Sequence, residues 1–274
     1  MDRTKQLQTV LSLCSGYGGL ERGIDLAGVG ARVVAYVEVE AFAVANLVAK
    51  MEEGRLDPAP IWSDLKTFPV EIFRNRIDIM VGGYPCQPFS TAGWRQGRDD
   101  PRHLWPYVLK AVDSIRPLRV FFENVEGHVT RGLSEVVEDL EGIGYRSEWG
   151  LFSAEEVGAP HRRRRVFIMA DTDGCRSREN LEPGEPRANG IVEPSGDSRN
   201  ARPGEVGEIQ VWPARPGEVQ KIWEEPRVIE PGMGRATDGT SARLDRLRLL
   251  GNGVVPATAS RAWQVLSERL ENDV

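Results

Sequence analysis

One cysteine of this chain stands where an enzyme would present a nucleophile. Cys86 comes shortly after the apolar run Ile77 to Val81, on a turn shaped by glycine and proline that reads Gly82-Gly83-Tyr84-Pro85-Cys86-Gln87-Pro88-Phe89-Ser90. The carboxyl end of a strand is where α/β folds place reactive groups, and an ionised thiol there can attack an electron-poor carbon. The segment therefore predicts covalent catalysis by Cys86, whereas a cysteine without such neighbours would be a buried structural thiol.

A second group of residues that could bind a ligand follows the first predicted strand. Leu13 leads into the turn Cys14-Ser15-Gly16-Tyr17-Gly18-Gly19, which opens a predicted helix. Glycines at such a turn let the backbone approach a ligand closely, although a plain strand-to-helix turn would look the same. Glu38 follows the next strand, about where nucleotide-binding α/β folds place an acid for ribose hydroxyls, and Asp64 follows a third apolar patch. The pattern favours a nucleotide-type cofactor.

A parallel sheet is needed to bring these residues together. From residue 9 to residue 170, apolar strands alternate with helical patterns, which is typical of a mostly parallel, doubly wound sheet covered by helices. The predicted strands are Thr9–Leu13, Ala31–Val37, Ile77–Val81, Leu118–Phe122, Tyr145–Phe152 and Arg165–Met169. The predicted helices are Leu20–Ala27, Ala41–Met51, Leu104–Ile115, Leu133–Ile143 and Ala257–Leu270. The expected fold class is α/β.

The alternating pattern stops at Asp171. Residues 171–235 contain 9 Gly and 8 Pro, a density close to that of disordered segments, so no large independent core is expected there. Regular pattern returns near Leu244, and the last helix is expected to pack back onto the first domain. We therefore expect a catalytic and cofactor-binding domain at 1–170, a small irregular region at 171–243, and a C-terminal segment at 244–274 that folds back.

Composition limits the partners. The 274 residues include 35 Lys and Arg against 41 Asp and Glu, a net charge of −6, so affinity for a polyanion must come from local basic surface. Three cysteines and three histidines show no metal-ligand or disulfide spacing, and neither a metal nor a disulfide is expected. The N-terminus lacks an apolar signal core and no stretch approaches the roughly 20 apolar residues of a membrane span, so a cytoplasmic location without membrane contact is expected.

Three motifs in order carry a resemblance to a known family. The Pro85-Cys86-Gln87 turn, then Glu123-Asn124-Val125, then Arg163-Arg164-Arg165, resemble the motifs of DNA (cytosine-5) methyltransferases of bacterial and phage type. The resemblance implies the Rossmann-like class I methyltransferase fold, S-adenosyl-L-methionine as cofactor with S-adenosyl-L-homocysteine as product, and no metal. It also implies methyl transfer to carbon 5 of a cytosine that is flipped out of double-stranded DNA.

The same resemblance implies roles for the catalytic residues. Carbon 5 of cytosine is a poor nucleophile, so Cys86 would first add to carbon 6 and push electron density to carbon 5. Glu123, just past the predicted strand Leu118–Phe122, would act as an acid toward ring N3 and the amino group. Arg163 and Arg165 would position the cysteine and the base oxygen. Without the other motifs, the basic run at Arg162–Arg165 would indicate only a solvated or phosphate-binding face.

Cofactor-binding residues are also implied. The glycine turn would take the methionine part, Glu38 the ribose and Asp64 the adenine amino group, while Asn252 resembles the last family motif, which closes over the cofactor. The full set is Cys14, Ser15, Gly16, Gly18, Gly19, Glu38, Val39, Asp64, Leu65, Gly83, Pro85, Leu104, Asn252 and Gly253. The chain departs from the family at Cys14, where Phe is usual, and at Val39, where a bulky residue is usual, so adenine stacking is expected to be weaker.

DNA would be bound by residues around the reactive turn and the basic run. The resemblance implies contacts from Gln87, Ser90, His161 and Arg162, with target recognition in residues 171–243. His161 stands where Gln is usual; an ordinary surface histidine is the alternative interpretation. A monomer is expected, and a cognate restriction enzyme would be the matching partner in a restriction-modification system.

Two alternative functions stay open from the sequence. The first is methylation of cytosine in RNA such as tRNA, because the catalytic residues would not distinguish the two nucleic acids. The second is a catalytically silent DNA-binding relative, suggested by the acidic region 171–235, Val39 and His161, although Cys86 and Glu123 argue against it.

Overall fold

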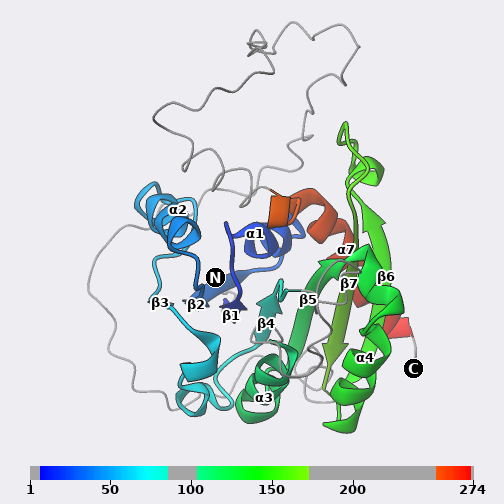
Figure 1. Cartoon of the computed structure of the whole chain (residues 1–274), viewed down its shortest axis with the longest axis horizontal. Helices are drawn as coiled ribbons and strands as arrows, with labels where there is room; N and C mark the ends of the chain where they lie inside the picture. Colours follow the sequence, from blue (N-terminus) through cyan, green and yellow to red (C-terminus); the bar gives the residue numbers. More distant parts are fainter. Residues whose placement is uncertain (1–6, 86–103, 173–250, 273–274) are drawn as a thin grey trace, which may run out of the picture.

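The computed structural model of the chain describes residues 7–85, 104–172 and 251–272 (Figure 1). Three predicted site residues, Cys86, Gln87 and Ser90, lie outside the described residues, as does nearly all of the predicted region 171–243.

Seven strands form one sheet in the order β3-β2-β1-β4-β5-β7-β6. The strands are β1 (Gln8–Leu13), β2 (Ala31–Val37), β3 (Ile61–Trp62), β4 (Ile79–Gly82), β5 (Arg119–Val125), β6 (Arg146–Ser153) and β7 (Arg164–Asp171). Strands β1 to β5 run parallel to one another, whereas β7 lies antiparallel between β5 and β6. The predicted α/β class with a mostly parallel sheet is confirmed.

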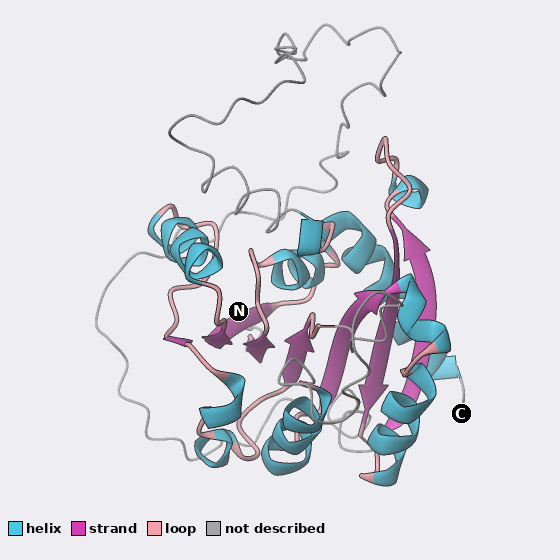
Figure 2. Cartoon of the chain, in the orientation of Figure 1, coloured by secondary structure: helices cyan, strands magenta, loops and turns pink. Residues whose placement is uncertain are grey.

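Helices cover both faces of the sheet (Figures 1 and 2). The α-helices are α1 (Gly19–Leu26), α2 (Ala41–Glu52), α3 (Trp105–Ile115), α4 (Leu133–Gly142) and α7 (Pro256–Asn272). Short 3-10 helices are η1 (Leu65–Thr67), η2 (Val70–Phe73), η4 (Glu126–Thr130) and η5 (Glu155–Val157). Burial places α3 and α4 against one face, and α1, α2 and α7 against the other. The sheet is therefore doubly wound.

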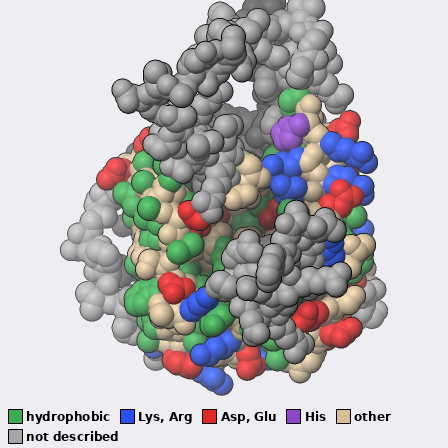
Figure 3. Space-filling model, viewed as in Figure 1, with side chains coloured by type: hydrophobic (Ala, Val, Ile, Leu, Met, Phe, Trp, Pro, Cys, Tyr) green, Lys and Arg blue, Asp and Glu red, His purple; other side chains and the backbone are tan. Residues whose placement is uncertain are grey.

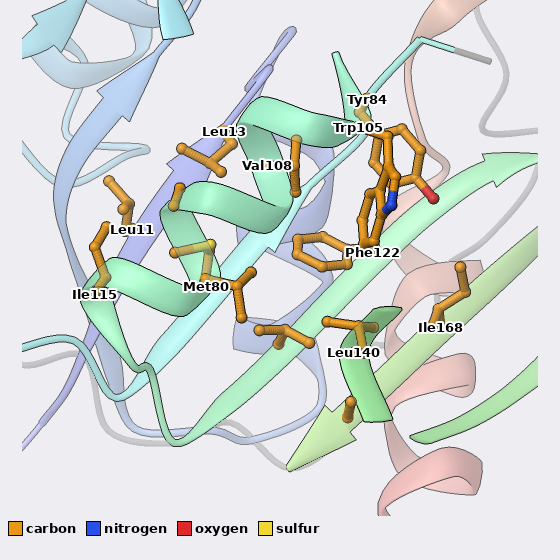
Figure 4. Close-up of a cluster of buried hydrophobic side chains, with 14 of the residues drawn as sticks. Leu11, Leu13, Met80, Tyr84, Trp105, Val108, Ile115, Phe122, Leu140 and Ile168 are labelled. Atoms are coloured by element: carbon orange, nitrogen blue, oxygen red, sulfur yellow. The ribbon is translucent and has the colours of Figure 1, made fainter. Parts of the chain in front are cut away.

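Each face carries its own apolar core. On the first, Trp105, Val108 and Ile115 recur at helical spacing on α3 and pack onto Met80 and Phe122 of the sheet (Figure 4). On the second, the buried side of α7 packs against α1 and the end strands of the sheet. A Cβ on Gly23 would lie 2.5 Å from Ala259 Cβ, so the lack of a side chain at Gly23 lets α7 approach α1 closely.

The structure differs from the sequence-based expectation at β5. This strand was predicted to end at Phe122, with Glu123 just past it, but it continues to Val125. The reason is the pairing with antiparallel β7, in which Glu123 lies opposite Phe167 and Val125 opposite Arg165. Glu123 is therefore held on a strand and not on a loop.

The direction of β7 decides what meets at one edge of the sheet. Strands β1 to β5 end at the same edge because they are parallel, and this is the edge where open α/β sheets bind ligands. Since β7 runs the other way, its first residues, and Arg163 just before them, lie at that edge too. The turn after β1, the acids after β2 and β3, and the arginine run are thus brought to one edge.

Candidate active site

Glu123 is the buried acid of the site. The residue is 5% exposed, and Arg165 Nε lies 3.0 Å from its Oε1 as an ion pair. Arg165 pairs with Val125, two residues along the strand, so the two side chains are diagonal neighbours on one face of the sheet. Burial raises the pKa of Glu123 to about 7, although the charges of Arg165 and Arg163 oppose the shift. A carboxyl with this pKa can hold a proton at neutral pH.

The backbone that leads to Cys86 passes this acid. A Cβ on Gly83 would lie 3.5 Å from Glu123 Oε2, which places the carboxyl beside the chain three residues before the cysteine. Pro85, the last described residue before Cys86, is exposed. The carboxyl of Glu123 therefore lies beside Gly83, in the turn that precedes the predicted nucleophile in the sequence.

Tyr84 is held from several sides. Its carbonyl oxygen accepts a hydrogen bond of 3.1 Å from Asn124 Nδ2, and its hydroxyl shares a buried hydrogen bond of 3.1 Å with His128 Nε2. Its ring packs against Trp105 and Phe122, with centroids 5.3 and 5.9 Å away (Figure 4). Burial lowers the pKa of His128 to about 4, so this histidine is neutral at pH 7. The residue two before Cys86 thus has a fixed backbone and a fixed side chain.

The glycine turn after β1 is tied to Glu38. The amide of Gly16 donates to Glu38 Oε2 at 2.7 Å, and the amide of Glu40 donates to Glu38 Oε1 at 2.8 Å. Ser15 is buried, and its amide donates to the carbonyl of Val37 at 3.2 Å. These bonds fix the carboxylate against the turn and leave each oxygen able to accept another donor.

The remaining predicted cofactor residues lie at the same edge with different exposure. Asp64 caps η1, where its Oδ1 accepts from the amide of Lys66 at 2.9 Å, and Leu65 beside it is buried. Val39 is 69% exposed, and Leu104 is the half-buried cap of α3. Desolvation in its partly buried site, with the nearby charge of Glu38, raises the pKa of the Cys14 thiol to about 12.

The turn has room for a ligand of the nucleoside type. Gly16 has φ +57°, and a Cβ added to it would meet nothing within 4 Å. Glu38 and Asp64 present carboxylate oxygens, which suit hydroxyl and amino donors. Gly18 and Gly19 are closely packed instead: added Cβ atoms would lie 2.9 Å from Leu56 and 2.6 Å from the carbonyl of Val254. These carboxylate acceptors and the open side of the turn fit S-adenosylmethionine.

Arg163 binds a different segment from the one expected. Its Nη2 donates to the carbonyl of Gly251 at 2.7 Å and also to the carbonyl of Gly253, while Asn252 between them is exposed. The hydroxyl of Tyr17, from the glycine turn, donates to the carbonyl of the next residue, Val254. Two side chains from separate parts of the chain therefore hold the segment that contains Asn252.

The arginine run also lines a surface pocket. A pocket of about 480 Å³ is bordered by Val125–Gly127 and Arg162–Arg165. Arg164 Nη1 pairs with Glu126 Oε1 at 2.7 Å, while Arg162 and His161 are exposed. In the view of Figure 3, basic side chains gather at this corner of the molecule. Local positive charge therefore exists here despite the acidic net charge of the chain.

Three contributors were not identified from the sequence. Tyr17 lies inside the glycine turn and Asn124 inside Glu123-Asn124-Val125, so both stood in segments already singled out. His128 follows shortly after, but nothing in its neighbours marks it as the partner of Tyr84. Their roles depend on contacts between segments distant in sequence.

The part of the chain that the structure describes contains neither a metal-binding cluster nor a membrane-spanning helix. Within residues 7–85, 104–172 and 251–272, no three His, Cys, Asp or Glu side chains gather so as to hold a metal ion. None of the helices described here has both the length and the apolar character required to cross a membrane.

Solved structures with the same fold include methyltransferases. The chain aligns with the S. pombe Dnmt2 methyltransferase with a TM-score of 0.50 and 24% identity, over 61% of this chain and 51% of that chain. It aligns with Spodoptera frugiperda DNMT2 with a TM-score of 0.52 and 21% identity, over 69% of this chain and 56% of that chain. At these identities the likeness shows the fold.

Sequence relatives point to one family. The type II methyltransferase M.NgoMIV of Neisseria gonorrhoeae is 32% identical over 59% of this chain and 51% of its own length. The type II methyltransferase M.BsuRI of Bacillus subtilis is 32% identical over 58% of this chain and 42% of its own length. The chain thus spans about half, or less, of the curated relatives it matches. The family model for C-5 cytosine-specific DNA methylase matches residues 8–191, well over half of the chain, and the chain therefore belongs to that family.

Proposed function

We propose that this protein methylates carbon 5 of cytosine in double-stranded DNA through a covalent adduct with Cys86. The observation that carries the proposal is Glu123: a buried carboxyl with its pKa raised to about 7, paired with Arg165 and lying beside Gly83 of the turn that leads to Cys86. An acid that holds a proton at neutral pH, beside a thiol, is what addition to a pyrimidine ring requires. Family membership supports the same reaction.

The proposed roles follow from the chemistry of the ring. The thiolate of Cys86 adds to carbon 6 of the target cytosine, and Glu123 gives a hydrogen bond or a proton to ring N3, so that the electron pair gathers at carbon 5. Arg165 holds the carboxyl of Glu123 in place and lies where it can bind the base oxygen. After methyl transfer, a base such as water takes the proton from carbon 5, the electron pair of that C–H bond forms the C5=C6 double bond, and Cys86 leaves carbon 6 as a thiolate with the electrons of the C–S bond.

We propose S-adenosylmethionine as the cofactor, held by the residues around the glycine turn. It would supply an electrophilic methyl group on a sulfonium. Glu38 accepts from the ribose hydroxyls and Asp64 from the adenine amino group, and the open side of Gly16 leaves room for the ligand backbone. Cys14 plays no covalent part, because its raised pKa keeps the thiol protonated.

The partner and setting are proposed on the same grounds. Gln87, Ser90, His161 and Arg162 bind the DNA, whose target sequence is read by residues 171–243. The exposed Arg162 and the basic pocket beside it support a polyanionic partner. Residues 1–170 act as the catalytic domain, and 244–274 as a segment that completes it. The protein works as a cytoplasmic monomer, with a restriction enzyme as its matching partner.

The test is expression in a bacterial host that lacks cytosine methylation, followed by mapping of 5-methylcytosine at base resolution. The parent chain should place marks in one short sequence, and Cys86→Ala should place none. Marks that persist in Cys86→Ala would overturn the assignment of the nucleophile. Methyl transfer to RNA with an unmarked genome would favour the RNA alternative.

A covalent trap tests the mechanism directly. An oligonucleotide with 5-fluorocytosine at the target lacks the proton that must leave, so the Cys86 adduct should accumulate as a species that survives denaturing electrophoresis. Formation of this species by the parent chain but not by Cys86→Ala would support the proposed adduct. A parent chain that methylates yet never forms it would contradict covalent catalysis.

A further inference from the structure

Arg163 is placed by unusual backbone geometry. Its φ of +30° lies in the left-handed region that residues other than glycine rarely adopt, and such a conformation persists only where surrounding contacts compensate for its strain. The contacts found here are the two hydrogen bonds from its guanidinium to the carbonyls of Gly251 and Gly253. These carbonyls lie 88 and 90 positions further along the chain. Arg163 therefore connects the start of β7 to the segment before α7.

Tyr17 holds the same segment from the other side. Its hydroxyl donates to the carbonyl of Val254, and its ring lies so close to Gly253 that a Cβ there would come within 1.7 Å of Cε1. Tyr17 is fixed in turn by Lys50, whose ammonium lies 4.7 Å from the centre of the ring and donates to the carbonyl of Tyr17. The segment 251–254 is thus bound by one residue of the arginine run and one of the glycine turn.

The segment also packs directly on that turn. A Cβ on Gly19 would lie 2.6 Å from the carbonyl of Val254, so the two backbones are in contact. On its other side, Arg163 lies within the electrostatic reach of Arg165 and Glu123 as well as of Tyr17. Arg163 therefore stands between the buried acid and the cofactor end of the site.

We propose that Arg163 is a positioning residue for the cofactor side: together with Tyr17 it holds segment 251–254 against the glycine turn and so links cofactor binding to the Glu123–Arg165 pair. This rests on the proposed function for the identity of the cofactor. The resemblance implied a role for Arg163 at the cysteine and the base oxygen, which stays a prediction; the contacts with Gly251 and Gly253 add a second task. A ligand at the turn binds more weakly if the segment must first be ordered, because it then bears the entropy of ordering.

The test measures S-adenosylhomocysteine binding to the full chain by calorimetry, without nucleic acid. Arg163→Ala is expected to weaken binding about tenfold or more, and Tyr17→Phe, which removes one oxygen and keeps the ring, about threefold to tenfold. The matched control is Arg164→Ala, which removes the neighbouring arginine that pairs with Glu126, and its affinity should stay within about twofold. The double variant should lose less than the product of the two single losses, because both side chains hold one segment.

If Arg163→Ala binds S-adenosylhomocysteine as tightly as the parent chain but no longer transfers methyl groups, the proposal is overturned. A role for Arg163 at the target base would then be favoured. Hydrogen exchange of residues 251–260 supplies a readout that needs no ligand. Exchange should be faster in Arg163→Ala and Tyr17→Phe than in the parent and in Arg164→Ala, and unchanged exchange in both would also overturn it. If Arg163→Ala fails to fold, the affinity and hydrogen exchange of Tyr17→Phe alone test the proposal.

The two proposals can fail separately. A parent chain that binds no S-adenosylhomocysteine would contradict the proposed cofactor, while the exchange measurement would still decide how segment 251–254 is held.

Discussion

The side-chain amide of Asn124 donates a hydrogen bond of 3.1 Å to the backbone carbonyl of Tyr84. Its own oxygen accepts from the amide of Val125 at 2.9 Å, so one buried side chain connects the end of β5 to the turn after β4. The turn carries the proposed nucleophile and the strand carries the proposed acid. Asn124 therefore ties the strand that carries Glu123 to the turn that precedes Cys86 in the sequence.

Asn124→Ala is expected to lower the rate of methyl transfer about a hundredfold, because small displacements of reacting groups are costly, and to lower stability by about 1–3 kcal/mol. Single-turnover kinetics and urea unfolding measure the two effects. Asn46→Ala is the matched control: within the described part of the chain the buried Oδ1 of Asn46 has no hydrogen-bond partner, so little should be lost. Parent kinetics in Asn124→Ala would contradict the positioning role.

The pair formed by Tyr84 and His128 should behave as a coupled unit. Tyr84→Phe and His128→Leu each leave the other buried polar group without this partner and should each cost about 1–3 kcal/mol. The double variant should cost less than the sum of the two, by about 1 kcal/mol, which urea unfolding of the four proteins measures. Additive losses would show that the two side chains contribute independently.

The raised pKa of Glu123 predicts a pH dependence. The protonated carboxyl, which can donate to ring N3, predominates below pH 7 and is lost as the pH rises through about 7. Glu123→Gln donates at every pH but cannot give up a proton, so it should be slower than the parent. The ratio of parent to variant rate in single turnovers should fall as the pH rises from 6 to 9, by about tenfold per unit above the pKa. A constant ratio would contradict proton donation by Glu123.

Cys14 should resist alkylation. Its pKa of about 12 keeps the thiol protonated at pH 8, and the thiolate is the reactive form. Iodoacetamide should therefore modify Cys86 in the native chain and leave Cys14 unmodified, as measured by mass spectrometry of peptides. In urea both should react, which controls for detection of each peptide. Rapid native modification of Cys14 would show that its thiol ionises readily.

Two nearby glycines give a matched pair of substitutions. A Cβ at Gly253 would lie 1.7 Å from the Tyr17 ring, whereas a Cβ at Gly251 would meet nothing within 4 Å. Gly253→Ala should destabilise the fold by about 1–3 kcal/mol and weaken S-adenosylhomocysteine binding, and Gly251→Ala should do neither. Thermal unfolding and calorimetry measure both, and equal behaviour of the two variants would contradict the tight contact at Tyr17.

Much of the fold could be predicted from local pattern. The alternation of apolar strands with helices of 3.6-residue period placed β1, β2, α3 and α4 within a few residues of their observed bounds. The direction of β7 was not predicted, because apolar periodicity is the same for parallel and antiparallel strands. The extension of β5 to Val125 was missed for a related reason: those residues are strand because β7 pairs with them.

In the candidate site, too, local sequence pattern predicted some features, whereas contacts between distant segments could not be predicted. Glu38 was singled out because it follows the second strand, where an acid could meet ribose hydroxyls; the structure shows its carboxylate bonded to Gly16 of the glycine turn, and the ribose contact stays a prediction. The contacts of Arg163 could not be predicted, because its partners are carbonyl groups, which every residue carries and no sequence pattern marks. For Cys86 the assignment remains a proposal from sequence and family membership.

The direction of β7 has a consequence for protein engineering. Asp171 pairs with Arg119 at the start of β5, so Thr172 lies near the edge opposite the active site, whereas Gly251 is bound to Arg163 just before β7 begins. The 8 residues of β7 separate these two points by about 26 Å, at roughly 3.3 Å per residue. A shortened chain that joins Thr172 to Gly251 therefore needs a linker of about eight extended residues. A foreign DNA-reading module inserted at this position must have its own two termini about as far apart.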